Sequence, residues 1–145
     1  MSLINFDSIS LNPSILRALK ELGYETPTAI QAAAIPEAIL GKDILATAQT
    51  GTGKTAAFAL PILHRLAENR SRPDIRAPRA LILTPTRELA LQIDGNIRLY
   101  ARYLRLRTGV IMGGVPVYPQ IKMLRRNPDI LVATPGRLID LFDQG

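Results

Sequence analysis

The sequence predicts an α/β fold in which a parallel β-sheet carries helices on both faces. Short apolar segments alternate along the chain with amphipathic stretches of helical periodicity, and turn-forming residues separate them. A glycine-rich run at residues 48–55 lies between one apolar segment and one helical pattern. Because ligands of such sheets bind at the carboxyl ends of the strands, the residues after each strand are candidate site residues.

Helix signals are strongest in the N-terminal part of the chain. Asn12 is typical of an N-cap, Pro13 of a first helical position and Gly23 of a helix end. A second helix is expected to begin near Thr28 and to break before Pro36, because proline disfavours the helical conformation in the residue before it.

Further elements follow at regular intervals. The helix that begins at Lys54 is expected to kink or restart at Pro61, and residues 68–79 form a polar, proline-containing loop. Later helices are expected with an apolar face at Leu89, Ile93, Ile97 and Tyr100, over residues 117–125, and from about Gly136. Strands are expected over residues 43–47, 80–84, 108–112 and 129–133.

Composition restricts the class of protein. The 145 residues suffice for one domain with a core, and a hydrophobic fraction of 47% argues against disorder. The absence of cysteine excludes a disulfide framework and a thiolate metal site. No apolar run reaches the roughly 18 residues of a membrane span, and no secretory signal precedes the first helix. The expectation is a cytoplasmic protein that contacts no membrane; the sequence leaves its oligomeric state open.

Positive charge is concentrated in the second half of the chain. Residues 1–75 carry seven Lys/Arg and seven Asp/Glu, whereas residues 76–145 carry eleven Lys/Arg and five Asp/Glu, so the excess of six lies there. Such an excess indicates a polyanionic partner, nucleic acid first, or simply a solvated basic surface. Charge alone does not favour either interpretation.

Residues 48–55, Ala-Gln-Thr-Gly-Thr-Gly-Lys-Thr, are typical of a phosphate-binding P-loop. The glycines allow backbone N–H groups to turn toward phosphate oxygens, and the N-terminus of the following helix adds partial positive charge. Lys54 would reach the β- and γ-phosphates, and the Thr55 hydroxyl would bind Mg²⁺. Ala48 occupies the place of the first glycine in the general motif. The alternative, a glycine-rich surface turn, fits the strand–loop–helix context poorly.

Five motifs in order resemble those of the DEAD-box RNA helicases and cover the chain from Phe6 to Arg137. The resemblance rests on a Q motif at residues 23–31 with an aromatic 17 positions upstream, the P-loop with alanine first, Pro85-Thr86-Arg87-Glu88-Leu89-Ala90 (motif Ia), Gly113-Gly114 (the GG motif) and Thr134-Pro135-Gly136-Arg137 (motif Ib). The resemblance implies a RecA-like P-loop NTPase domain of the bacterial type.

In that family the Q motif and the P-loop bind adenine nucleotide. The resemblance therefore implies contacts with ATP or ADP and Mg²⁺ from Phe6, Tyr24, Thr26, Thr28, Gln31, Thr50, Gly51, Thr52, Gly53, Lys54 and Thr55. Gln31 would recognise adenine, because a side-chain amide offers one donor and one acceptor to the N6/N7 edge and guanine presents a different pattern. Either Phe6 or Tyr24 would pack on the base.

The resemblance also implies that motifs Ia, GG and Ib bind one RNA strand through phosphates and sugars. The residues involved would be Pro85, Thr86, Arg87, Gly113, Gly114, Thr134, Pro135, Gly136 and Arg137. Local chemistry agrees, since Pro85–Arg87 opens a helix whose free N–H groups and arginine can meet a phosphate, and residues 134–137 repeat the pattern. Glycines at 113–114 would let the RNA backbone approach closely. The chain has three Phe, four Tyr and no Trp, which argues against a platform of aromatic rings that stack on bases.

Two features limit the assignment. His64 is the sole histidine and is expected to lie on a helix surface rather than to bind metal. No Asp-Glu-Ala-Asp occurs in residues 1–145, so the chain is interpreted as the N-terminal portion of RecA-like domain 1, truncated before that motif and without the second RecA-like domain.

This interpretation predicts a piece of an ATP-dependent RNA helicase that is inactive alone and hydrolyses ATP only as the full-length product. It also predicts an exposed apolar surface and low stability in isolation, because the missing strands would lie beside the P-loop strand. The alternative is a complete, non-catalytic module that binds nucleotide and RNA. A different P-loop ATPase fits the ordered motifs less well.

Overall fold

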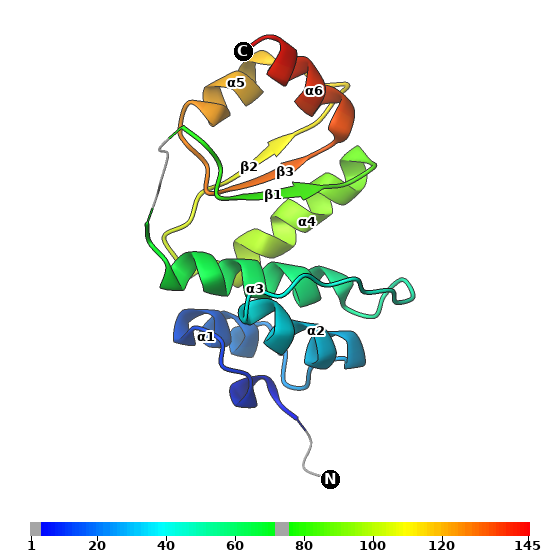
Figure 1. Ribbon diagram of the computed structural model, residues 1–145, viewed down its shortest axis with the longest axis vertical. Helices are drawn as coiled ribbons and strands as arrows, with labels where there is room; N and C mark the ends of the chain where they lie inside the picture. Colours follow the sequence, from blue (N-terminus) through cyan, green and yellow to red (C-terminus); the bar gives the residue numbers. More distant parts are fainter. Residues whose placement is uncertain (1–3, 72–75) are drawn as a thin grey trace. The chain divides into compact units, whose positions relative to one another are not determined.

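The computed structural model describes residues 4–71 and 76–145 and divides the chain into two compact units (Figure 1). The first unit comprises Met1–Arg70 with Leu99–Arg105, and the second comprises Ser71–Arg98 with Leu106–Gly145. The first contains the Q-motif and P-loop residues, and the second contains motifs Ia, GG and Ib. Each unit is considered separately below.

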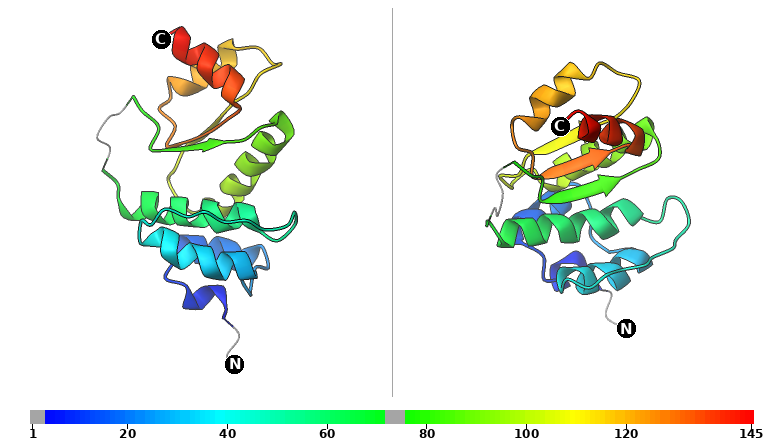
Figure 2. Two further views of the ribbon diagram at one scale, coloured as in Figure 1. Left: turned by 45° about the vertical axis from the view of Figure 1, so that its right-hand side comes forward. Right: turned by 45° about the horizontal axis from the view of Figure 1, so that its top comes forward.

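The first unit is helical. It contains the 3₁₀ turn η1 (Phe6–Ser8) and the helices α1 (Pro13–Glu21), α2 (Ala29–Ile39) and α3 (Lys54–Glu68). Figure 1 and both views of Figure 2 show α1 and α2 beside α3. Their contact surface buries large aliphatic side chains from all three helices, namely Ile15, Leu19, Ile35, Leu60 and Leu63. Burial of such side chains supplies most of the stability of short helices.

The predicted signals at the ends of α1 are confirmed. The Asn12 side chain accepts a hydrogen bond from the Ser14 N–H, and Pro13 occupies the first helical position. Gly23 follows the helix with a φ of +78°, a conformation that glycine adopts without steric cost. These boundaries depend on neighbours in the chain, which explains why the sequence alone located them.

The prediction of a break before Pro36 is wrong, because α2 continues through it to Ile39. Pro36 lacks the N–H of one helical bond, but the preceding residues Ala34 and Ile35 are buried and α2 packs along α3. Packing of this face therefore offsets the lost hydrogen bond. Helix α3 is likewise continuous through Pro61 and does not restart there.

The predicted strand over residues 43–47 does not form. The segment has no regular structure, and the side chains of Ile44 and Leu45 are 42% and 99% exposed. An extended segment becomes a strand only when its N–H and C=O groups pair with a neighbouring strand, and the described part of the first unit contains no strand. The predicted exposed apolar surface is confirmed here.

The second unit is built on a parallel three-stranded sheet. Strands β1 (Ala80–Leu83), β2 (Thr108–Ile111) and β3 (Ile130–Ala133) lie in the order β1-β3-β2, so β3 pairs with both others. The helices are α4 (Arg87–Tyr100, whose last two residues belong to the first unit), α5 (Tyr118–Leu124) and α6 (Pro135–Asp143). Figures 1 and 2 show α5 and α6 over one face of the sheet and α4 over the other, which confirms the predicted layers.

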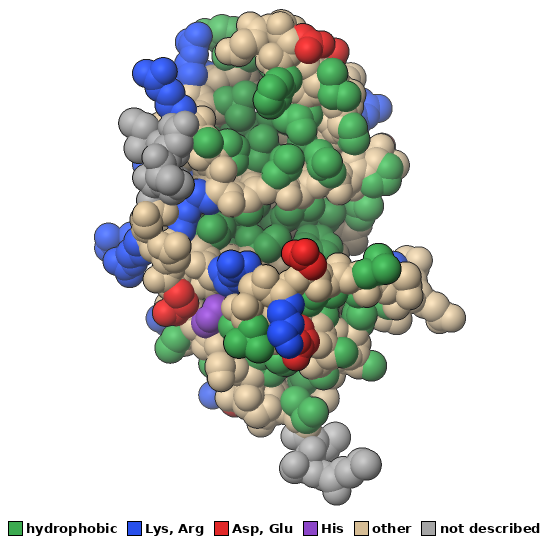
Figure 3. Space-filling view, in the orientation of Figure 1, with side chains coloured by type: hydrophobic (Ala, Val, Ile, Leu, Met, Phe, Trp, Pro, Cys, Tyr) green, Lys and Arg blue, Asp and Glu red, His purple; other side chains and the backbone are tan. Residues whose placement is uncertain are grey.

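The register explains which apolar side chains remain exposed. Leu131 and Ala133 of β3 pack with Ile111 against α5 and α6. Leu81 and Leu83 pair with Leu131 and Ala133, so they share that face. They are nevertheless 51% and 56% exposed on the edge strand β1. Figure 3 shows hydrophobic side chains gathered at this surface of the second unit.

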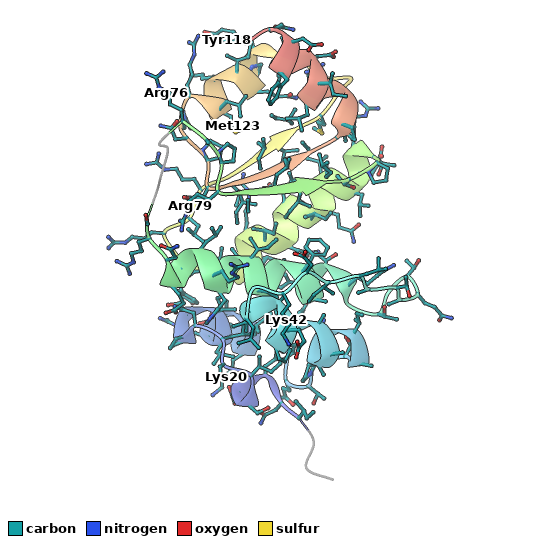
Figure 4. All side chains as sticks on the ribbon, in the orientation of Figure 1. Lys20, Lys42, Arg76, Arg79, Tyr118 and Met123 are labelled. Atoms are coloured by element: carbon teal, nitrogen blue, oxygen red, sulfur yellow. The ribbon has the colours of Figure 1, made fainter. Side chains whose placement is uncertain are left out.

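Two close contacts fix the sheet. Met123 extends from α5 toward the sheet (Figure 4), and a Cβ on Gly109 of β2 would overlap its sulfur, so only glycine allows this approach. At the amino ends of the strands, Asp129 accepts a hydrogen bond from the Arg107 N–H at 2.9 Å and forms a 3.5 Å ion pair with Arg79. Both side chains of the ion pair are largely buried, which makes the pair costly to break.

Within the first unit, residues 99–105 contact α1 through polar and aromatic side chains. The Tyr103 hydroxyl hydrogen-bonds to both carboxylate oxygens of Glu21 at 2.6 Å, and the Arg17 guanidinium lies 3.9 Å from the centre of the Tyr103 ring. The hydrogen bond from Tyr103 and the charges of Arg102 and Arg17 lower the pKa of Glu21. The carboxylate is thus ionised at neutral pH and accepts both bonds.

His64 has a structural role in the first unit. Its Nδ1 accepts a hydrogen bond from the Asn12 N–H at 2.9 Å, while the Asn12 side-chain amide donates to Glu68 at 2.9 Å. These bonds attach the start of α1 to α3. Among the described residues, no group of three or more His, Cys, Asp or Glu is arranged to hold a metal ion.

Replacing His64 with Phe should lower the free energy of unfolding by about 1 kcal/mol, because the partly buried Asn12 N–H would lose its acceptor. His64→Asn should retain most of the stability, since the asparagine oxygen is positioned similarly to Nδ1. Urea unfolding followed by circular dichroism measures both variants. Equal stability of His64→Phe and the unmodified chain would show that the bond contributes nothing.

Candidate functional site

Two glycines of the P-loop have a backbone conformation that other residues rarely adopt. Gly51 and Gly53 both have a φ of +83°, in the left-handed region. Gly53 is the N-cap of α3 and supplies no side-chain cap, so no side chain of the cap residue occupies the N–H groups of the first turn. A helix N-terminus in this state is suited to bind an anion.

Two side chains of the P-loop form hydrogen bonds with carbonyl groups of the same loop. The Lys54 ammonium group donates to the Ala48 carbonyl at 2.8 Å, and the Thr52 hydroxyl donates to the Gln49 carbonyl at 2.6 Å. Lys54 is thereby held against the backbone of its own loop. Thr55, the predicted Mg²⁺ ligand, is half-buried in the first turn of α3.

Gln31 joins the Q motif to the P-loop. Its side chain is 4% exposed, its amide nitrogen donates to the Gly53 carbonyl at 3.1 Å, and its amide oxygen accepts from the Thr28 N–H at 3.0 Å. Thr28 in turn accepts from the Gln31 N–H, which completes a capping box at the start of α2. One donor and one acceptor position of the amide are thus used within the chain, and adenine recognition by Gln31 stays a prediction.

The aromatic residues of the Q-motif region form a row. The ring centroids of Phe6 and Tyr24 are 6.4 Å apart, and those of Tyr24 and Tyr100 are 5.9 Å apart with an edge-on arrangement. Burial raises the pKa of Tyr100, and the neighbouring Tyr24 hydroxyl at 3.4 Å raises it further. Phe6 is buried and Tyr24 is exposed, and the packing of either ring on a base stays a prediction.

Motifs Ia, GG and Ib meet at one edge of the sheet in the second unit. They follow β1, β2 and β3 respectively, and the hydrogen-bonded ladder extends beyond the strands through Thr84 N–H to the Ala133 carbonyl and Thr134 N–H to the Ile111 carbonyl. The prediction that these motifs fall at carboxyl ends of parallel strands is confirmed.

Arg87 of motif Ia contacts the GG motif. Gly114 has a φ of +75°, a region that favours glycine, and a Cβ built there would meet the Arg87 guanidinium, the flexible end of a long side chain. Gly113 has no neighbour within 4 Å of such a Cβ. The two glycines therefore have different roles. Gly114 permits a close approach of Arg87, whereas Gly113 leaves the loop surface open.

The starts of α4 and α6 differ, although the sequence predicted the same arrangement for both. Thr86 accepts a hydrogen bond from the Leu89 N–H at 3.2 Å and so caps α4. Thr134, the N-cap of α6, makes no side-chain cap bond, and Pro135 occupies the first turn. The expectation of free N–H groups thus fits motif Ib better than motif Ia.

Arg137 of motif Ib is held by two contacts with the GG region. One guanidinium nitrogen donates to the Val115 carbonyl at 3.0 Å, and the other lies 3.4 Å from the amide oxygen of Gln120. Sequence reasoning missed Gln120. Gln120 precedes Met123 and Leu124 by three and four residues, so the three side chains lie on one face of α5, and Met123 and Leu124 pack against the sheet. This spacing is the sequence signal for a polar side chain on a buried face.

The order of these motifs and their meeting at one sheet edge agree with the sequence comparison. The family model for DEAD/DEAH box helicases matches residues 28–145. The chain belongs to the DEAD/DEAH box helicase family. The parallel sheet with flanking helices is the RecA-like fold predicted from the sequence.

Relatives of this helicase chain include plant, bacterial and archaeal proteins. It is 53% identical over 135 residues to DEAD-box ATP-dependent RNA helicase 28 of Arabidopsis thaliana, covering 93% of the chain and 17% of that protein. It is 43% identical to DEAD-box ATP-dependent RNA helicase RhpA of Helicobacter pylori, covering 94% of the chain and 26% of that protein. The chain thus spans about a quarter or less of these relatives.

A solved structure supports the same fold. The crystal structure of a hypothetical ATP-dependent RNA helicase from Sulfolobus tokodaii superposes with a TM-score of 0.82 at 41% identity, over 93% of this chain and 37% of that one. Within the described residues, no helix is long and apolar enough to cross a bilayer.

Gly114→Ala should destabilise the second unit of this helicase chain by about 1–2 kcal/mol, because the methyl group would displace Arg87 and force an unfavourable φ. Gly113→Ala is the matched control and should cost less than half as much, since open space surrounds its position. Thermal unfolding measures both. Equal losses for the two variants would contradict the contact between Arg87 and Gly114.

Proposed function

We propose that this chain binds adenine nucleotide through the Q motif and the P-loop, and RNA backbone through motifs Ia, GG and Ib. We further propose that it forms the N-terminal portion of RecA-like domain 1 in an ATP-dependent RNA helicase. The single observation that carries the proposal is the meeting of motifs Ia, GG and Ib at the carboxyl edge of one parallel sheet, with Arg87 and Arg137 at the same loop. Family membership supports it.

For the nucleotide, the P-loop offers backbone N–H groups and Lys54. The Ala48 carbonyl that Lys54 now contacts is a weaker partner than a phosphate oxygen, so nucleotide binding would transfer the ammonium group to the β- and γ-phosphates. Gln31 would add its second donor and second acceptor positions to the base, while Thr26, Thr28 and the rings of Phe6 and Tyr24 shape the surroundings.

The residues present fit Mg²⁺ at one coordination position. Thr55 carries a hydroxyl in the first turn of α3, where the family motif places a metal ligand. Magnesium, when bound, neutralises charge that develops on the phosphates. Residues 1–145 contain no Asp-Glu-Ala-Asp, and among the described residues no group of three or more His, Cys, Asp or Glu is arranged to hold a metal ion.

For RNA, the site offers backbone-directed chemistry. Arg87 and Arg137 supply charge, the start of α6 supplies uncapped N–H groups, and Gly113 and Gly114 leave the loop without side chains. Such groups recognise phosphates and sugars rather than base edges, so binding should be independent of sequence and weaken with salt.

A second candidate function is a module that binds adenine nucleotide and RNA without turnover. The observation that favours it is that residues 1–145 contain no Asp-Glu-Ala-Asp to position Mg²⁺ and water.

Gln31→Ala should weaken ATP binding about tenfold and GTP binding less, because loss of the bond to Gly53 affects both nucleotides whereas only adenine matches the amide pattern. Titration of the chain with fluorescent ATP and GTP analogues measures this, and Gln92→Ala, at an exposed glutamine of α4, is the control. If the unmodified chain binds ATP and GTP equally well, the proposed role of Gln31 is wrong.

In a gene product that contains this chain and has the length of its relatives, ATP hydrolysis should rise when RNA is added. Lys54→Ala should lower the rate by about 10²-fold or more, because the ammonium group that would contact the β- and γ-phosphates is lost. Lys20→Ala, at an exposed lysine of α1 (Figure 4), is the matched control and should retain the rate. A product that shows no RNA-stimulated hydrolysis would favour the non-catalytic module.

A further inference from the structure

Gln120 is a buried polar side chain that no motif accounts for. It lies in α5, close to the GG motif in sequence, and is 7% exposed. A buried amide is retained at little cost only when both its donor and its acceptor are paired. Its partners therefore show what the side chain does.

Gln120 joins two of the proposed RNA-binding motifs. Its amide nitrogen donates to the carbonyl of Met112, the residue before the GG motif, at 2.8 Å. Its amide oxygen lies 3.4 Å from the Arg137 guanidinium of motif Ib, which also donates to the Val115 carbonyl at 3.0 Å. The loop of residues 112–115, Gln120 and Arg137 thus form a closed ring of hydrogen bonds around the GG motif.

We propose that Gln120 is a positioning residue that holds Arg137 and the GG loop in the geometry that receives an RNA phosphate. This inference rests on the proposed function. Arginine has five N–H donors in a rigid plane, and the two contacts within the ring use one on each of two nitrogens, so further donors remain for an anion. A guanidinium fixed before binding loses less conformational entropy when the phosphate arrives.

The residue type matters because the ring needs a donor and an acceptor on one side chain. Glutamine provides both, whereas methionine has a similar length and provides neither an N–H nor a carbonyl oxygen. Gln120→Met would leave the Met112 carbonyl without this donor and free Arg137 to sample other rotamers. Charge, the number of arginines and the GG motif itself would be unchanged.

The test measures RNA affinity of the 145-residue chain by fluorescence anisotropy with a labelled single-stranded oligouridylate at several salt concentrations. Circular dichroism first confirms that each variant is folded. Gln120→Met should bind about tenfold more weakly, and Arg137→Ala should weaken binding at least as much. Gln92→Met, the same substitution at an exposed glutamine, should bind as the unmodified chain does.

A double-mutant cycle separates positioning from general damage to the fold. If Gln120 acts mainly through Arg137, Gln120→Met should cause less than about a threefold further loss in the Arg137→Ala background, through the contact with Met112. A full tenfold further loss would show that Gln120 does not act through Arg137, and the inference would be overturned.

Arg137→Lys gives an independent test that leaves the buried residue intact. Lysine keeps the charge but cannot contact Gln120 and Val115 at once through a planar fork, so RNA binding should fall about fivefold or more. Unchanged affinity would show that the fixed guanidinium geometry is not needed.

The outcomes also separate this inference from the proposed function. If the unmodified chain shows no salt-dependent RNA binding, or if Arg137→Ala has no effect, the RNA site itself is misassigned. If Arg137→Ala weakens binding and Gln120→Met does not, the site stands and only the role of Gln120 is rejected.

Discussion

The pairing of β3 with both neighbouring strands determines the geometry of the candidate RNA site. All four residues of Ile130–Ala133 are buried, and they align β1 and β2 in parallel on either side. Because the strands run in one direction, the segment that leaves each strand emerges at the same edge. Motifs that are distant in the chain therefore come together, and the arginines at positions 87 and 137 reach the same loop.

Arginines that make residues 76–145 basic lie at both ends of the strands of the second unit. Arg79 forms a buried ion pair with Asp129, and Arg107 donates to the Arg126 carbonyl at 2.7 Å, so these side chains stabilise the amino edge of the sheet. Arg87 and Arg137 lie instead at the carboxyl edge, beside the GG loop.

The proposed nucleotide-binding residues depend on a different contact, the packing of α2 along α3 in the first unit. This packing brings Gln31 against Gly53, where any side chain on Gly53 would overlap the amide. A change in the P-loop backbone would therefore disturb the Q motif directly. The same packing allows α2 to continue past Pro36, which its local sequence disfavours.

The sequence by itself determined the features that depend on neighbouring residues: the cap at Asn12, the left-handed turn at Gly23, the three paired strands and the order of the motifs. Family membership followed from the same local patterns. Only tertiary structure decided three others, namely the lack of a strand at residues 43–47, the helix through Pro36 and the buried bonds of Gln120. Each of these depends on partners distant in the chain, because strand pairing, helix packing and satisfaction of a buried amide are not encoded by neighbouring residues alone.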